Sequence, residues 1–163
     1  DWGAWVGRTE VGTDSVSPRA ARQMLATLDR VAAPERLGPG DPLPPLWHWL
    51  AWQPEAALGG LGPDGHPARG GFLPPVPLER RMWAGSRVAF LAPLRLGEAM
   101  ERRSTIVKVS EKQGAAGAMV FVTVAHEVTG AAGPAIREEQ DIVYLATGGI
   151  VRHKDKRRQR GTT

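Results

Sequence analysis

Glycine and proline divide this 163-residue chain into a segment that cannot hold long regular elements and segments that can. The chain contains 20 glycines and 14 prolines, and most of the prolines lie between Pro34 and Pro77. The pairs Gly38-Pro39, Pro44-Pro45, Gly62-Pro63 and Pro74-Pro75 mark turns there and interrupt helices and strands. This composition argues against a helical bundle and favours a fold built on a β-sheet.

Regular elements are predicted on both sides of the proline-rich segment. Residues 5–14 alternate weakly and are compatible with an edge strand, and Ser17-Pro18 is a strong helix start that predicts a helix over residues 18–29. Four strands are predicted over residues 82–91, 102–110, 119–125 and 136–145. Short turns join the last three into an antiparallel meander, which places Arg102-Arg103 roughly across from His126-Glu127. The order of elements predicts an α+β domain with helical material against one sheet face.

One hydrophobic island, residues 46–52, interrupts the proline-rich segment. It holds Trp47, Trp49 and Trp52, which would bury a large apolar area if they were packed. The island can be an anchor that holds an irregular loop on the sheet, or an aromatic wall of a ligand pocket. The two interpretations are compatible.

The remaining composition sets limits on the class of protein. The chain has no cysteine, so disulfides, thiolate metal ligands and cysteine nucleophiles are excluded. No membrane span or signal peptide is visible, and we expect a cytoplasmic protein. The net charge of +4 is concentrated in residues 151–160, so the body is near neutral and a nucleic-acid partner is not expected. We predict one domain over residues 1–148 and a basic, flexible tail over residues 149–163.

Several strings in this order resemble one family. They are Trp5-Val-Gly-Arg-Thr-Glu, Pro44-Pro-Leu-Trp-His-Trp-Leu, Leu61-Gly-Pro-Asp-Gly-His-Pro, Gly70-Gly-Phe-Leu-Pro-Pro-Val-Pro-Leu, Arg80-Arg-Met-Trp-Ala-Gly, Pro93-Leu-Arg, Glu101-Arg-Arg-Ser, Val120-Phe-Val-Thr-Val and Glu139-Gln-Asp-Ile-Val-Tyr. Together they look like the N-terminal half of mesaconyl-C4-CoA (3-methylfumaryl-CoA) hydratases, which belong to the MaoC-like and FAS1-like dehydratases. The resemblance spans residues 2–146 and implies a hot-dog fold, an antiparallel sheet wrapped around a helical segment.

The resemblance also implies that one hot-dog unit binds the substrate and a second unit carries the catalytic residues. In the family a second hot-dog repeat carries an Asp and a His that activate water for addition to an enoyl thioester, and the strings above do not include that motif. The chain would then be the substrate-binding half or subunit of an enoyl-CoA hydratase, in a homodimer or with a catalytic hot-dog partner. The coenzyme A thioester would be its substrate, with no separate cofactor. The alternative is a non-catalytic hot-dog module that binds acyl-CoA or acyl carrier protein as a partner subunit.

Hydration of an enoyl thioester needs a general base, a proton donor and groups that stabilise the enolate-like oxygen. None of the four histidines shows metal-site spacing, and we predict no catalytic or metal-ligating residue in this chain. His126 is interpreted as a structural histidine. Arginine suits a ligand carboxylate or a CoA phosphate, because its planar fork forms two parallel hydrogen bonds. The predicted substrate-binding residues are Arg69, Arg80 and Arg81 for that anion, Trp83 and Phe72 beside the acyl channel, and His66, Trp47 and His48.

The predicted role of Arg81 can be tested in a complete two-repeat enzyme. Replacing Arg81 by Ala removes a fork that would hold the free carboxylate of a dicarboxylyl thioester. We expect the Michaelis constant for a dicarboxylyl-CoA to rise substantially in steady-state hydration assays. An unchanged constant would remove Arg81 from the binding site.

Overall fold

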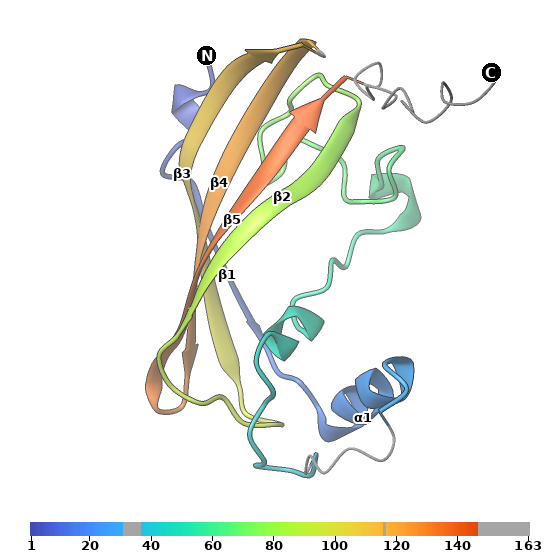
Figure 1. The fold of residues 1–163 in the computed structure, drawn as a ribbon, viewed down its shortest axis with the longest axis vertical. Coiled ribbons are helices and arrows are strands. Elements are labelled where there is room, and N and C mark those ends of the chain that lie inside the picture. Colours follow the sequence, from blue (N-terminus) through green and yellow to red (C-terminus); the bar gives the residue numbers. More distant parts are fainter. Residues whose placement is uncertain (31–36, 116, 147–163) are drawn as a thin grey trace, which may run out of the picture.

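The computed structural model describes residues 1–30, 37–115 and 117–146. Its centre is one antiparallel sheet in the order β1-β3-β4-β5-β2 (Figure 1). The elements are β1 (Thr9–Asp14), α1 (Pro18–Thr27), β2 (Arg80–Phe90), β3 (Met100–Gly114), β4 (Gly117–Gly130) and β5 (Gly133–Leu145), with three short 3-10 helices, η1 (Gly3–Trp5), η2 (Trp47–Leu50) and η3 (Leu58–Gly60). The predicted α+β class is confirmed. The predicted tail, residues 149–163, lies outside the described residues.

The predicted elements form at the expected places, and the four strands after the proline-rich segment are longer than predicted. The first strand is shorter, because β1 begins at Thr9 and η1 takes up Gly3–Trp5 before it. Ser17 caps α1, since its side chain accepts a hydrogen bond from the Ala20 backbone N–H at 3.0 Å and Pro18 occupies the first helical position. The helix ends at Thr27, two residues before the predicted end. Strands β3 and β4 pair as far as Gly114 opposite Gly117, so the ladder continues to the turn itself. Arg103 lies opposite Glu127, which agrees with the predicted register. No helix among the described residues is long and apolar enough to cross a membrane.

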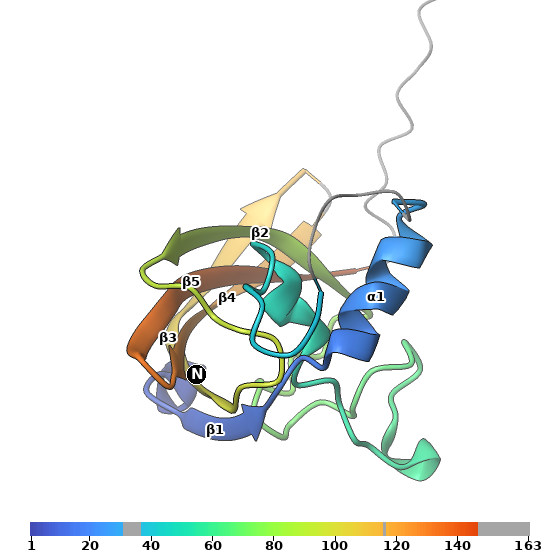
Figure 2. The ribbon, with the colours of Figure 1, turned by 90° about the horizontal axis from the view of Figure 1, so that it is seen from below.

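The sheet is curved, and its concave face holds the core. Figure 2 shows β1, β3, β4, β5 and β2 forming an arc around η2, with α1 on the open side of the arc. The core consists of two clusters, one around Met100, Val128 and Ile136 and one around Ile106, Val122 and Tyr144. Both clusters draw on β3, β4 and β5. The band of sheet between them is where polar side chains face inward.

Trp52 fastens the proline-rich segment to the edge strand β1. Its backbone N–H donates to Asp14 Oδ2 at 2.7 Å, and its indole Nε1–H donates to the Gly12 carbonyl at 3.1 Å. The guanidinium of Arg102 lies over the indole ring, 5.0 Å from its centre. A Cβ atom on Gly12 would lie 3.2 Å from Trp52 Cδ1, so an alanine there would press on the ring and require it to shift slightly. The anchor interpretation of the tryptophan island is therefore correct for Trp52.

The close approach of Trp52 to Gly12 predicts an unequal response of two strand glycines to alanine. Gly12→Ala should lower the free energy of unfolding by about 1 kcal/mol, because the hydrogen bonds that hold Trp52 resist the shift of the ring. Gly85→Ala is the matched control, since nothing lies within 4 Å of a Cβ built there. Its stability should stay equal or rise slightly through the less flexible unfolded chain. Urea unfolding followed by circular dichroism measures both, and equal effects would contradict the clamp.

Candidate functional site

A belt of polar side chains crosses the concave face between the two core clusters. Ser104, His126 and Glu138 are register partners on β3, β4 and β5, and Gln140 follows Glu138 on the same face of β5. Ser104 is fully buried and Glu138 is 5% exposed. Polar groups this deep must be hydrogen-bonded, so the partners of each decide its protonation state.

Glu138 is held by the first turn of η2. Trp49 Nε1–H lies 3.1 Å from each carboxylate oxygen, and His48 Nε2 lies 3.0 Å from Glu138 Oε2. Burial by itself would raise the pKa of Glu138, but the hydrogen bonds from His48 and Trp49 outweigh burial and lower that pKa. An ionised carboxylate only accepts, so His48 Nε2 carries a proton and donates it. His48 Nδ1 is buried and has no partner among the described residues.

His126 is held in its neutral form by burial and by uncharged hydrogen-bond partners. Its Nδ1 lies 2.7 Å from Ser104 Oγ and its Nε2 lies 3.0 Å from Gln140 Oε1, so both ring nitrogens have neutral partners. Burial lowers the pKa of His126 more than the hydrogen bond to Gln140 raises it, and the positive charge of Arg102 lowers that pKa further. The interpretation of His126 as a structural histidine agrees with these contacts.

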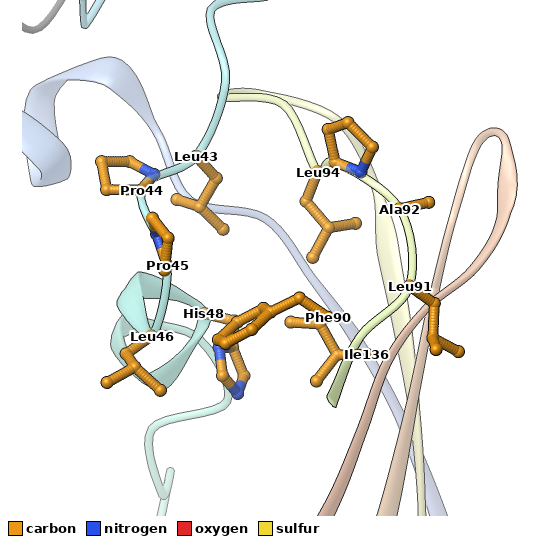
Figure 3. Close-up of a pocket in the computed structure, with 11 residues that line it drawn as sticks. Leu43, Pro44, Pro45, Leu46, His48, Phe90, Leu91, Ala92, Leu94 and Ile136 are labelled. Carbon is orange, nitrogen blue, oxygen red and sulfur yellow. The ribbon is translucent and has the colours of Figure 1, made fainter. Parts of the chain in front are cut away.

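An apolar pocket of about 350 Å³ lies beside the belt. Figure 3 shows Leu43, Pro44 and Pro45 on one side and Ala92 and Leu94 on the other, with Phe90 and His48 at one end. Trp49 follows the pocket residue His48, and its ring meets the ring of Trp83 on β2 edge-on at 4.9 Å. The pocket is more than twice the size of the roughly 150 Å³ apolar cavity that holds a benzene molecule. Its walls suit an apolar group.

A second polar cluster lies farther along the same face, where β2 begins. Arg81 and Tyr144 are register partners on β2 and β5, and Arg81 Nη2 donates to Asp64 Oδ2 at 3.1 Å. The Arg69 guanidinium lies 5.2 Å from the centre of the Tyr144 ring. Burial raises the pKa of Tyr144, and the charges of Arg81 and Arg69 only partly offset the rise. Tyr144 is six residues beyond Glu138, so about 20 Å of strand separates the belt from this cluster.

The predicted binding residues fall into these two regions. Trp47 packs against the core cluster around Met100, and His48 lines the pocket. Trp83 does not line the pocket, but its ring contacts that of Trp49. Arg81 and Arg69 belong to the second polar cluster, where β2 begins, and Phe72 packs against the core cluster around Tyr144. Arg80 is half-buried next to Arg81. Arg69 donates to the backbone carbonyls of Val76, Leu78 and Glu79, so several of its N–H groups are used to hold the loop before β2. His66 is exposed on a turn that Asp64 caps through the His66 backbone N–H at 3.2 Å.

The sequence does not predict several residues of the site, among them Glu138, Tyr144 and Asp64. Glu138 belongs to a run of four polar residues that looked solvent-exposed, whereas the structure buries the strand on both sides of it at Ile136 and Ile142. The available signal was the alternation of Ile136, Glu138, Gln140 and Ile142, which places all four on one face of β5. No metal-binding group of His, Asp or Glu side chains is found within residues 1–30, 37–115 and 117–146.

Comparison with known proteins identifies the family. Residues 46–162 match the family of hydroxyacyl-thioester dehydratase type 2. The chain belongs to this family. It is 44% identical over 152 residues to the mesaconyl-C4-CoA hydratase of Chloroflexus aurantiacus, a match that covers 93% of this chain and 53% of that protein. The chain thus spans about half the length of this relative.

Solved structures agree on the fold. The ChsH1–ChsH2 complex of Mycobacterium tuberculosis contains a chain with a TM-score of 0.54 and 15% identity, covering 85% of this chain and 88% of that chain. The HadBC (3R-hydroxyacyl-ACP dehydratase) complex from the same organism gives 0.54 and 12% identity, with coverage of 85% and 96%. The predicted hot-dog fold is confirmed.

The depressed pKa of His126 predicts a loss of stability in mild acid. The unfolded chain takes up a proton on this histidine near its ordinary pKa of about 6.5, whereas the folded chain resists protonation until a lower pH. Unfolding therefore becomes easier as the pH falls below that value. Glu138 acts in the same direction at lower pH, because its lowered pKa contributes stability that is lost as the carboxylate is protonated.

Denaturation midpoints between pH 7.5 and pH 5 measure the effect. His126→Gln should flatten this part of the profile, because glutamine does not titrate. His66→Gln is the control, since His66 is exposed, and it should keep the wild-type slope. A wild-type slope in the His126 variant would assign the acid sensitivity to another group.

Proposed function

We propose that this chain is the substrate-binding hot-dog half of an enoyl-CoA hydratase that adds water to mesaconyl-C4-CoA or a similar unsaturated acyl-CoA. The sequence identity of 44% to about half of a mesaconyl-C4-CoA hydratase supports this function. The observation that carries the proposal is the apolar pocket that opens beside an uncovered apolar sheet edge. A second hot-dog unit placed along that edge would enclose the pocket and complete the site.

The edge strand β2 is the surface that needs a partner. Trp83 is opposite Ile142 and Phe90 is opposite Ile136, so both point to the concave face, yet they are 51% and 50% exposed. A long edge strand with exposed apolar side chains is prone to pair with other chains unless it is covered. We name the following residues the β2-edge patch: Leu46, Trp49, Trp83, Phe90 and Leu91.

The two regions of the concave face suit different parts of one extended ligand. The pocket has apolar walls for an acyl or pantetheine segment, and the cluster of Arg81 and Arg69 provides positive charge for a carboxylate or a phosphate. An acyl-CoA thioester is long and carries anionic groups at a distance from its apolar part. A separation of about 20 Å along β5 is compatible with one such molecule bound across both regions.

We assign the proton transfers to the second unit. The acid–base side chains of the belt, His48, His126 and Glu138, are engaged with one another or with Trp49, Ser104 and Gln140. A group that holds the fold in this way is poorly placed to take a proton from water and release it in each cycle. This half would therefore position substrate, and the partner would supply the general acid and base.

Reconstitution with a second hot-dog unit tests the function. The chain is expressed alone and together with the half of the Chloroflexus relative that it does not match. Hydration of mesaconyl-C4-CoA is followed by the loss of enoyl absorbance. Turnover is expected only for the pair. Turnover by the chain alone would make it a complete enzyme, and acyl-CoA binding without turnover in any combination would favour a non-catalytic acyl-CoA or acyl-carrier-protein module.

Variants of exposed apolar residues test the docking edge in the same system. Phe90→Asp places a charge in the β2-edge patch and should weaken association of the two units by at least tenfold, measured by analytical ultracentrifugation. Val11→Asp is the matched control, because Val11 is 49% exposed but lies on β1 at the opposite edge of the sheet. Equal effects of the two variants would place the interface elsewhere.

A further inference from the structure

We propose that Asp64 occupies, from within the molecule, a carboxylate-binding site formed by Arg81 and Tyr144. A ligand carboxylate would displace Asp64 from Arg81. The nature of the ligand rests on the function proposed above, whereas the site itself rests on the contacts described below.

Arg81 is a largely buried cation with spare hydrogen-bonding capacity. Its side chain is 13% exposed, and one donor, Nη2, contacts Asp64 Oδ2 at 3.1 Å. A guanidinium carries five N–H groups in a planar fork that matches a carboxylate with two parallel bonds. Asp64 takes one of these N–H groups, and the Tyr144 hydroxyl lies near the same guanidinium, so the fork still has N–H groups for a ligand carboxylate.

Tyr144 supplies the second, independent observation. It is fully buried, and its hydroxyl lies near the Arg81 guanidinium but has no acceptor for its proton among the described residues. As the register partner of Arg81, it projects from the same face of the sheet at the neighbouring position. A buried hydroxyl without an acceptor is costly, and an anion placed on Arg81 could accept its proton. The site thus offers donors from two strands to one carboxylate.

Asp64 holds its place by local contacts that can be exchanged. It sits at a turn closed by the Gly62 N–H to His66 carbonyl bond at 2.7 Å, and Asp64 Oδ1 accepts from the His66 backbone N–H. Its side chain is 25% exposed, so water screens its attraction to Arg81. The turn could remain closed by its backbone bonds while Asp64 gives up Arg81.

The charges of the cluster favour such an exchange. Arg69 stays in place because it donates to three loop carbonyls, and its charge lies close to the Tyr144 ring. With Asp64 on Arg81, the two guanidinium groups are matched by one carboxylate, so the cluster retains positive charge for an incoming anion. The ligand class that fits is a carboxylate on a neutral chain, such as the free carboxylate of a dicarboxylic monoester or thioester.

Titration with small acids tests the site without any enzymatic reaction. Monomethyl succinate, its neutral dimethyl ester and inorganic phosphate are added separately to the labelled chain, and the amide resonances of residues 81 and 144 are followed by NMR. Asp64→Asn removes the internal competitor and should tighten monomethyl succinate binding about three- to fivefold, the range expected for a partly exposed ion pair. Arg81→Gln and Tyr144→Phe should each weaken it.

Asp141→Asn is the matched control, because Asp141 pairs with Arg87 on the convex face at 2.8 Å and should leave binding unchanged. The side-chain carboxyl resonance of Asp64 in the wild type gives a readout that needs no variant, and it should shift as monomethyl succinate binds. The proposal is overturned if Asp64→Asn fails to tighten binding, if the dimethyl ester binds equally well, or if phosphate alone binds. Loss of the site with hydration intact would leave the proposed function standing.

Discussion

The buried carboxylate of Glu138 is the interaction on which the rest of this structure depends. It lies on the concave face of β5 and accepts hydrogen bonds from His48 and Trp49, which belong to a segment 90 residues earlier in the chain. An ion at this depth is tolerated only when its hydrogen bonds are satisfied, so the position of η2 and the charge state of Glu138 determine each other. Pocket, belt and β2-edge patch all lie around this contact.

An irregular segment can cover a sheet in place of a long helix only if it is held at several points. Trp52 is held by β1, Trp49 and His48 by β5, and Arg69 by the carbonyls of the loop that leads into β2. Each anchor joins a side chain of the proline-rich segment to a group on the sheet or on the backbone. Proline lowers the entropy of the unfolded segment, so fewer such contacts are needed to order it. The hollow beside η2 is left open because this cover is not a continuous helix.

Local sequence signals were sufficient for the elements and insufficient for the polar belt. Ser17-Pro18 located the start of α1, and the β-branched runs located the strands, because capping and alternation act within a few residues. The sequence allows the tryptophans to be anchors or a pocket wall, but it does not predict their hydrogen-bond acceptors, Glu138 and the Gly12 carbonyl. A glutamate in a polar run normally indicates an exposed strand. Its burial here results from partners that only the tertiary fold brings near, and the same holds for Arg81 and Asp64.

Arginines on the two faces of the sheet differ in exposure and in their acidic contacts. The position of an arginine therefore decides how strongly it can bind an anion. Arg87 on the convex face is 58% exposed and contacts both Glu139 and Asp141, so its fork is filled by two carboxylates in water. Arg81 on the concave face is much less exposed and has a single acidic contact, beside a buried hydroxyl. Coulombic attraction is stronger where water is excluded, so an anion gains more at Arg81 than at Arg87. The register of β2, including the irregularity between Trp83 and Gly85, is what places one arginine on each face.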